Sequence, residues 1–172
     1  EGGNIILNKD DKFFNFLSDK AEKKGISVIS FSSRKKADIY LLSVKKIGNH
    51  SRLKVVIDNK IYYFDTIYTT NNFISNILAC ISVLSVLNLD LNNIRKKFTK
   101  FIIPNGRGDV KIVKKFKKKF KFIDESYNAN PLSMSSAIKN MNFYKRKNNT
   151  KKLVLLGDML ELGKKSIKLH KE

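Results

Sequence analysis

Residues 4–31, NIILNKDDKFFNFLSDKAEKKGISVISF, decide the fold of this chain. The apolar runs at the two ends of this stretch predict β-strands, and Phe14, Leu17 and Ala21 between them recur on one helix face. Gly25 ends that helix, because glycine adopts the left-handed backbone conformation found after helix C-termini. A strand–helix–strand unit of this length joins two parallel strands, so the stretch predicts an α/β protein.

Three further strands and two helices are expected before the next break in the chain. The dipeptide Asp58-Asn59 between two β-prone runs is a hairpin signal. A long apolar run that includes Cys80 predicts a deeply buried helix, with the cysteine as a small buried apolar residue. The strands are expected at 38–44, 52–57 and 60–67, and the helices at 72–87 and from Asp90 through Phe101.

The segment PNGRG at 104–108 breaks regular structure and marks a domain boundary, with expected domains at 1–104 and 105–172. The second part is expected to hold a lysine-rich hairpin at 110–123, a helix that begins at Pro131, and a buried strand at 153–156. The residues expected to face inward are Val110, Ile112, Phe116, Phe120 and Phe122 in the hairpin, and Met134, Ala137, Ile138 and Met141 in the helix.

The charge of the chain favours an anionic partner or a solvated basic surface. Among 172 residues, 35 are Lys or Arg and 15 are Asp or Glu, for a net charge of +20. Basic residues interleaved with aromatics at 111–121 could bind nucleic acid. The alternative is a hairpin whose lysines face water, in a chain whose Lys-, Asn- and Ile-rich composition is typical of an AT-biased coding sequence.

Three loop segments carry polar residues that could bind a ligand, and each has a structural alternative. The loop at 124–131 precedes a helix N-terminus, where free N–H groups favour an anion, although Asp124 and Asn130 could also only cap and turn. Arg107 is flanked by glycines, which permits a close approach to a phosphate. The segment 157–163 holds two carboxylates between glycines, or is a turn with a helix cap.

Motifs for several other chemistries are missing from the sequence. There is no G-x-x-x-x-G-K-S/T phosphate loop, no G-x-G-x-x-G and no Cys/His cluster. His50 and His170 stand alone and are interpreted as surface or packing residues. Since no nucleophile is paired with a base, no catalytic residue is predicted within this chain. Since there is no Cys/His cluster, no metal ligand is predicted either.

Taken in chain order, these segments resemble the Mur ligases, in particular the MurF type, the UDP-N-acetylmuramoyl-tripeptide–D-alanyl-D-alanine ligases. The resemblance rests on IDESYNANP at 123–131 and LGDMLELG at 156–163. Supporting matches, which extend it over the whole chain, are EGG at 1–3, LNKDD at 7–11, NILAC at 76–80 and GRG at 106–108.

The resemblance implies that residues 1–104 are the C-terminal half of the central, ATP-binding domain, a mixed sheet with helices. Residues 105–172 would then begin a Rossmann-like C-terminal domain. The chain would be an internal piece of the protein, inactive by itself because the phosphate loop and the Mg²⁺ ligands of the family lie upstream.

The resemblance also implies which residues meet the nucleotide. Asn76 would contact the adenine part of ATP, Arg107 would reach its phosphates, and Asp124 would meet the nucleotide when the domains close. Four further residues would face the substrate or the neighbouring domain without a defined role: Asn128, Asn130, Asp158 and Glu161.

The implied activity is amide formation in peptidoglycan synthesis. ATP, with Mg²⁺, would activate the terminal carboxylate of UDP-N-acetylmuramoyl-tripeptide as an acyl phosphate, which the amine of D-alanyl-D-alanine then attacks. A cytoplasmic monomer without nucleic-acid or membrane partners is expected. The alternatives are another amide ligase of the superfamily, of the MurE or folylpolyglutamate synthase type, and a basic nucleic-acid-binding module.

Overall fold

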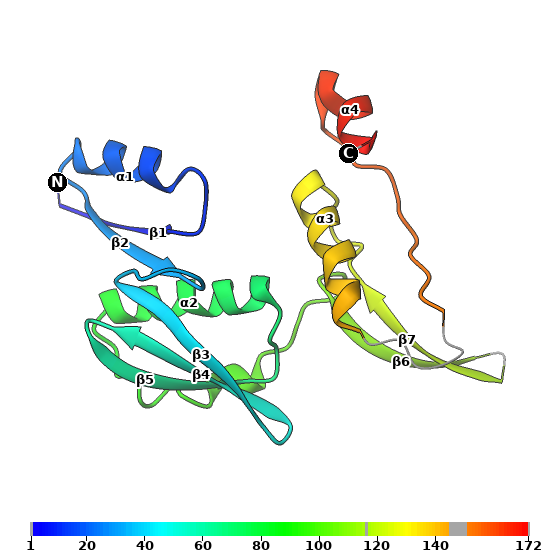
Figure 1. The fold of residues 1–172 in the computed structure, drawn as a ribbon, viewed down its shortest axis with the longest axis horizontal. Helices are drawn as coiled ribbons and strands as arrows, with labels where there is room; N and C mark the ends of the chain where they lie inside the picture. Colours follow the sequence, from blue (N-terminus) through cyan, green and yellow to red (C-terminus); the bar gives the residue numbers. More distant parts are fainter. Residues whose placement is uncertain (1, 116, 145–150, 172) are drawn as a thin grey trace. The chain divides into compact units, whose positions relative to one another are not determined.

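A computed structural model of the chain describes residues 2–115, 117–144 and 151–171. The chain divides into two compact units, Glu1–Phe101 and Ile102–Glu172, which are described separately. Figure 1 shows the elements of each unit in chain order. Unit 1 holds β1 (Asn4–Asn8), α1 (Phe14–Glu22), β2 (Ser27–Ser32), β3 (Ile39–Ile47), β4 (His50–Ile57), β5 (Lys60–Thr66), α2 (Asn71–Val86) and the 3-10 helix η1 (Lys97–Lys100).

The sheet of unit 1 has five strands in the order β1-β2-β3-β4-β5. β1, β2 and β3 are parallel neighbours, whereas β3, β4 and β5 form antiparallel hairpins. This mixed sheet with its helices confirms the predicted α/β class. The predicted hairpin at Asp58-Asn59 is also confirmed, since both residues have positive φ, 47° and 62°, as a two-residue hairpin turn requires.

The core of unit 1 lies between α2 and one face of the sheet. Leu53 and Phe64 from the sheet are fully buried, as are Leu78 and Ile81 from the helix. Cys80, however, is exposed, so the prediction that it is buried is wrong. A helix that packs on a sheet buries one stripe, and residue 80 is turned about 200° from residue 78 at 3.6 residues per turn.

The predicted helix from Asp90 through Phe101 is also wrong. Residues 91–96 form turns, followed by η1. The carbonyl oxygen of Arg95 accepts a hydrogen bond from the backbone N–H of Asp65 on β5, an edge strand of the sheet (2.8 Å). This carbonyl therefore bonds to the sheet and not to an N–H group of a helix. Leu91 and Phe98 are nevertheless buried, as their apolar spacing predicts, because the segment lies along the core.

Unit 2 holds β6 (Asp109–Lys115), β7 (Lys118–Asp124), α3 (Pro131–Asn140), the 3-10 helices η2 (Met141–Phe143) and η3 (Gly163–Lys165), and α4 (Ser166–Lys171). The predicted hairpin and the helix beginning at Pro131 are confirmed. Asn130 caps α3: its side chain accepts from the backbone N–H of Ser133, and the Ser133 hydroxyl accepts from the backbone N–H of Asn130. This reciprocal pair satisfies two N–H groups that would otherwise lack partners.

Two burial predictions for unit 2 are wrong. Ile112 pairs with Lys121 and Phe122 pairs with Lys111, which places Ile112 and Phe122 on opposite faces of the hairpin. Of the five residues expected to face inward there, the four described ones are exposed, and Phe116 lies outside the described residues. Similarly, α3 has no buried residue.

The segment 153–156 is not a buried strand either. It has no strand structure, and Leu153 and Leu155 are 80% and 85% exposed. A strand needs a neighbour for its backbone hydrogen bonds, and among the described residues β6 and β7 pair only with each other. In the part of the chain that the structure describes, no helix combines the length and apolarity needed to cross a membrane.

Candidate functional site

Two of the three predicted ligand-binding segments meet at one end of the β6–β7 hairpin. The glycine-flanked Arg107 precedes β6, and the loop that begins at Asp124 follows β7. Because the antiparallel register pairs Asp109 with Asp124, the two loops are neighbours. The backbone N–H of Gly108 donates to the carbonyl oxygen of Asp124 (2.7 Å), and the loops are thereby joined in unit 2.

Gly106 makes the closest approach between these loops. It is buried with φ +76°, and a Cβ at this position would lie 2.9 Å from the backbone nitrogen of Tyr127. The backbone N–H of Tyr127 donates to the carbonyl oxygen of Gly106 (3.1 Å), and the N–H of Gly106 donates to Oδ1 of Asp109 (3.1 Å). Both the backbone conformation and the available space therefore require glycine here.

Arg107 is exposed, and its guanidinium lies on the ring of Tyr127. The distance from Cζ of Arg107 to the ring centroid is 4.0 Å. Among the described residues this ring is the one partner of the Arg107 side chain. Its N–H donors are therefore available for a phosphate or carboxylate.

Three carboxylates surround this turn, those of Asp109, Asp124 and Glu125. The ion pair with Lys111, whose Nζ lies 2.9 Å from Oδ2, lowers the pKa of Asp109. Partial burial, together with the negative charges of Asp124 and Asp109, raises the pKa of Glu125. Oδ1 of Asp124 accepts hydrogen bonds from the backbone N–H (3.1 Å) and the hydroxyl (2.6 Å) of Ser126. Oδ1 of Asp124 thus holds the loop that follows β7 through its two hydrogen bonds to Ser126.

The remaining predicted residues of unit 2 are exposed. Asn130 caps α3, the role that the sequence analysis gave as the alternative to ligand binding for this residue. Asn128 lies two residues before it in the loop. Asp158 and Glu161 have no hydrogen bond to the Asp124 loop among the described residues. Glu161 has φ +62° and lies in a bend of the chain.

His170 holds the segment that carries Asp158 and Glu161. The backbone N–H of Met159 donates to Nε2 of His170 (2.9 Å), so Nδ1 carries the proton and donates to the carbonyl oxygen of Ser166 (2.9 Å). Met159 is buried. His170 thus has a packing role, as the sequence predicts.

Asn76 belongs to unit 1, where it is exposed on α2. The neighbouring Ser75 accepts a hydrogen bond through Oγ from Nδ2 of Asn8, at 3.5 Å. Since Asn8 is the last residue of β1, this part of α2 adjoins the carboxyl end of a parallel strand. Ligands of open α/β sheets bind at such ends.

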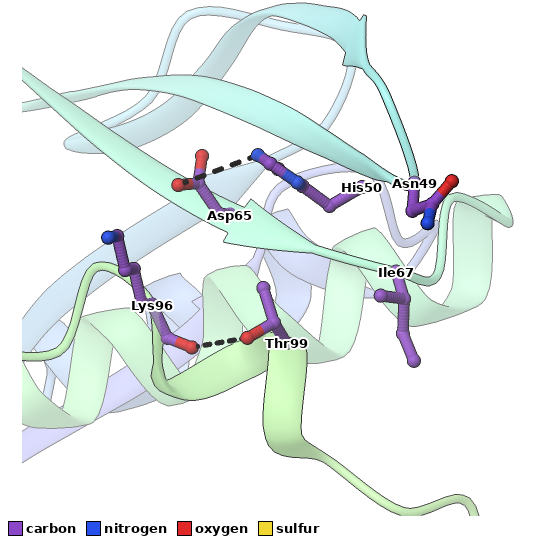
Figure 2. Close-up of a pocket in the computed structure, with 6 residues that line it drawn as sticks. All are labelled: Asn49, His50, Asp65, Ile67, Lys96 and Thr99. Atoms are coloured by element: carbon purple, nitrogen blue, oxygen red, sulfur yellow. Dashed lines mark hydrogen bonds and ion pairs between the residues drawn. The ribbon is translucent and has the colours of Figure 1, made fainter.

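Unit 1 also has a pocket of about 330 Å³ (Figure 2), lined by Asn49, His50, Asp65, Ile67, Lys96 and Thr99. None of the predicted site residues lines it. Its buried member is Asp65, whose carboxylate lies 3.9 Å from His50 Nε2 and accepts from Arg52 Nε at 2.8 Å. Arg95 Nε is 3.7 Å away.

The hydrogen bond from Arg52 lowers the pKa of Asp65, against the opposing effect of burial. The sequence analysis missed this cluster. Counting outward from the Asp58-Asn59 turn places Arg52 opposite Asp65, so the hairpin register was a signal that could have revealed the pair. The cluster around Asp65 connects β4 to β5 and to the segment at Arg95.

The class of protein follows from comparison with known families. The Mur ligase middle domain matches residues 1–84, and this part of the chain is similar to that domain. Among individual relatives, the chain is 30% identical over 179 residues to the UDP-N-acetylmuramoyl-tripeptide--D-alanyl-D-alanine ligase of Buchnera aphidicola subsp. Baizongia pistaciae. That match covers 99% of this chain and 35% of the relative.

Solved structures show the same fold. The crystal structure of MurF from Acinetobacter baumannii matches with a TM-score of 0.77 at 22% identity, covering 97% of this chain and 34% of that one. The MurF ligase of Thermotoga maritima in complex with ADP matches with a TM-score of 0.68 at 20% identity, covering 98% and 36%. The chain spans about a third of the length of the curated relatives it matches. The predicted family resemblance is confirmed.

Proposed function

We propose that this chain is part of an ATP-dependent ligase that joins D-alanyl-D-alanine to UDP-N-acetylmuramoyl-tripeptide. The observation that carries the proposal is the match of nearly the whole chain to two curated relatives with this name. In the same proposal, residues 1–104 belong to the central domain and 105–172 begin the C-terminal domain. The reaction takes place in the cytoplasm, with a monomeric protein and soluble substrates.

The proposed reaction has two steps. A carboxylate oxygen of the tripeptide attacks the γ-phosphorus of ATP, and ADP leaves. The amine of D-alanyl-D-alanine then attacks the acyl carbon and loses a proton, phosphate leaves, and an amide bond has formed. Charge neutralisation at the phosphates and positioning of the reactants account for most of the catalysis in such a reaction.

Three residues of this chain are proposed to serve these needs. The guanidinium of Arg107, with its donors available, binds phosphate oxygens of ATP. Asp124 contacts the nucleotide, and Asn76 contacts the adenine, a role supported by its place beside the carboxyl end of β1. Substrate-facing roles are proposed for Asn128, Asn130, Asp158 and Glu161.

The proposal includes Mg²⁺, held by residues other than those described. Within the ranges that the structure describes, no group of three His, Cys, Asp or Glu side chains could hold a metal ion. When bound, Mg²⁺ would neutralise phosphate charge. No step is assigned to it through residues of this chain.

The test is ADP release by the complete protein that contains this chain. We expect turnover only when ATP, the nucleotide tripeptide and D-alanyl-D-alanine are all present. Arg107→Ala should lower kcat by about 100-fold, the size of effect seen when a donor to transition-state charge is removed. Asp124→Ala should lower activity as well, whereas Lys139→Ala, a change at an exposed lysine of α3, serves as the control.

Turnover with a different amine acceptor in place of D-alanyl-D-alanine would instead identify a related ligase of the superfamily. Full activity of both Arg107→Ala and Asp124→Ala would refute the residue assignments while leaving the reaction class intact.

A further inference from the structure

The aromatic partner of Arg107 has no role in the function proposed so far. We infer that Tyr127 is a positioning residue, whose ring holds the Arg107 guanidinium in the orientation that binds the phosphates of ATP. The inference rests on the proposed function, which it deepens by assigning a second residue to the phosphate-binding arginine.

The contact is suited to hold an arginine without using its donors. The Arg107 Cζ atom lies 4.0 Å from the ring centroid, within the roughly 6 Å range of cation–π attraction. A guanidinium on a ring face presents its N–H groups around its edge, where they can bind phosphate oxygens in pairs. A carboxylate partner would occupy the same N–H groups.

Two of the three neighbouring carboxylates have other partners. Asp109 forms an ion pair with Lys111 and accepts a hydrogen bond from the backbone N–H of Gly106, and Asp124 accepts two hydrogen bonds from Ser126. Three acidic groups therefore surround the turn, yet the described structure pairs Arg107 with the tyrosine ring. The arginine stays free to pair with a ligand.

The backbone fixes the ring beneath the arginine. Tyr127 donates its N–H to the carbonyl oxygen of Gly106, the residue directly before Arg107, and Gly108 donates to Asp124 on the other side. The missing Cβ of Gly106 provides the space for this approach. Since both loops are tied on either side of the contact, the ring and the guanidinium are held together by more than their own attraction.

The kinetic test uses the complete protein with variants of both residues. Tyr127→Leu should lower kcat/KM for ATP by about two- to fivefold, the equivalent of an exposed cation–π contact. Tyr127→Phe keeps the ring and should retain wild-type kinetics. In the Arg107→Ala background, Tyr127→Leu should cause no further loss, because there is no guanidinium left to position. Tyr144→Leu, which removes a ring near Lys121 (5.2 Å), is the matched control.

A nuclear magnetic resonance measurement tests the contact without reference to activity. In wild type and Tyr127→Phe, the ring current should shift the side-chain protons of Arg107 upfield, and the shift should disappear in Tyr127→Leu. A missing shift in wild type overturns the inference, and so does a Tyr127→Leu loss that is equally large with and without Arg107. If the shift is present but the complete protein has no ATP-dependent ligase activity, the proposed function fails, and the positioning role fails with it.

Discussion

The buried carboxylate of Asp65 should contribute to the stability of unit 1. We expect Asp65→Asn to lower the free energy of unfolding at neutral pH. The amide keeps the size of the side chain, but it replaces one acceptor oxygen by an N–H₂ group that faces the guanidinium of Arg52. The perturbation is thus electrostatic and leaves packing unchanged.

The magnitude follows from the contacts of Asp65. Arg52 donates two hydrogen bonds to the carboxylate, from Nε at 2.8 Å and from Nη2 at 3.3 Å. Hydrogen bonds to charged groups contribute about 1.5–3 kcal/mol each. Because the Arg52 and Arg95 side chains are 31% and 40% exposed, water screens part of the loss, so we expect a total of about 2 kcal/mol.

The assay is urea unfolding followed by circular dichroism, with Asp19→Asn on the exposed side of α1 as the control. The pH dependence gives a second check. The folded-state pKa of Asp65 lies below its ordinary value of 3.8, so the stabilisation is complete above that value. It is lost as the pH falls below 3.8 towards the lowered pKa, and wild type and variant should then converge.

Two results would refute this reasoning. One is an Asp65→Asn variant as stable as Asp19→Asn at pH 7, which would mean that the arginines find equally good partners in water. The other is a stability difference that grows as the pH falls, since that would require a raised pKa in the folded state.

Three further predictions concern packing, capping and the His170 contact. Phe64→Ala removes a fully buried ring and should destabilise unit 1 by about 3–5 kcal/mol in urea unfolding, whereas Phe16→Ala at an exposed site should cost little. Asn130→Ala removes the cap of α3 and should cost about 1 kcal/mol, measured as a lower melting temperature of unit 2. His170→Ala removes the acceptor of the Met159 N–H and should speed hydrogen exchange at that amide.

Each of these has an outcome that contradicts it. Equal losses for Phe64→Ala and Phe16→Ala would argue against the core between α2 and the sheet. An Asn130→Ala variant as stable as Asn128→Ala would show that the capping pair is unimportant. Unchanged exchange at Met159 in His170→Ala, with Lys171→Ala as the control, would show that His170 does not hold the loop.

Much of the candidate site in unit 2 could be predicted from the sequence. The loops of Arg107 and Asp124 flank a predicted hairpin, and the two ends of a hairpin lie side by side. The pairing of Arg107 with Tyr127 could not be predicted, because an exposed arginine between glycines has several possible partners within reach. The functional roles of Asn76, Arg107 and Asp124 remain predictions.

The sequence by itself determined those elements that form because of the backbone preferences of neighbouring residues. The strand–helix–strand start, the turn at Asp58-Asn59 and the helix that begins at Pro131 all form as predicted, because backbone preferences of neighbouring residues act wherever the segment lies. Only the tertiary structure decided burial and partners. Cys80 and the apolar residues at 153–156 are exposed, and the chain near Arg95 gives its carbonyl to the edge of β5. An apolar side chain is buried only where another element covers it, and a carbonyl bonds to the donor that the fold brings near, so neither follows from a segment read alone.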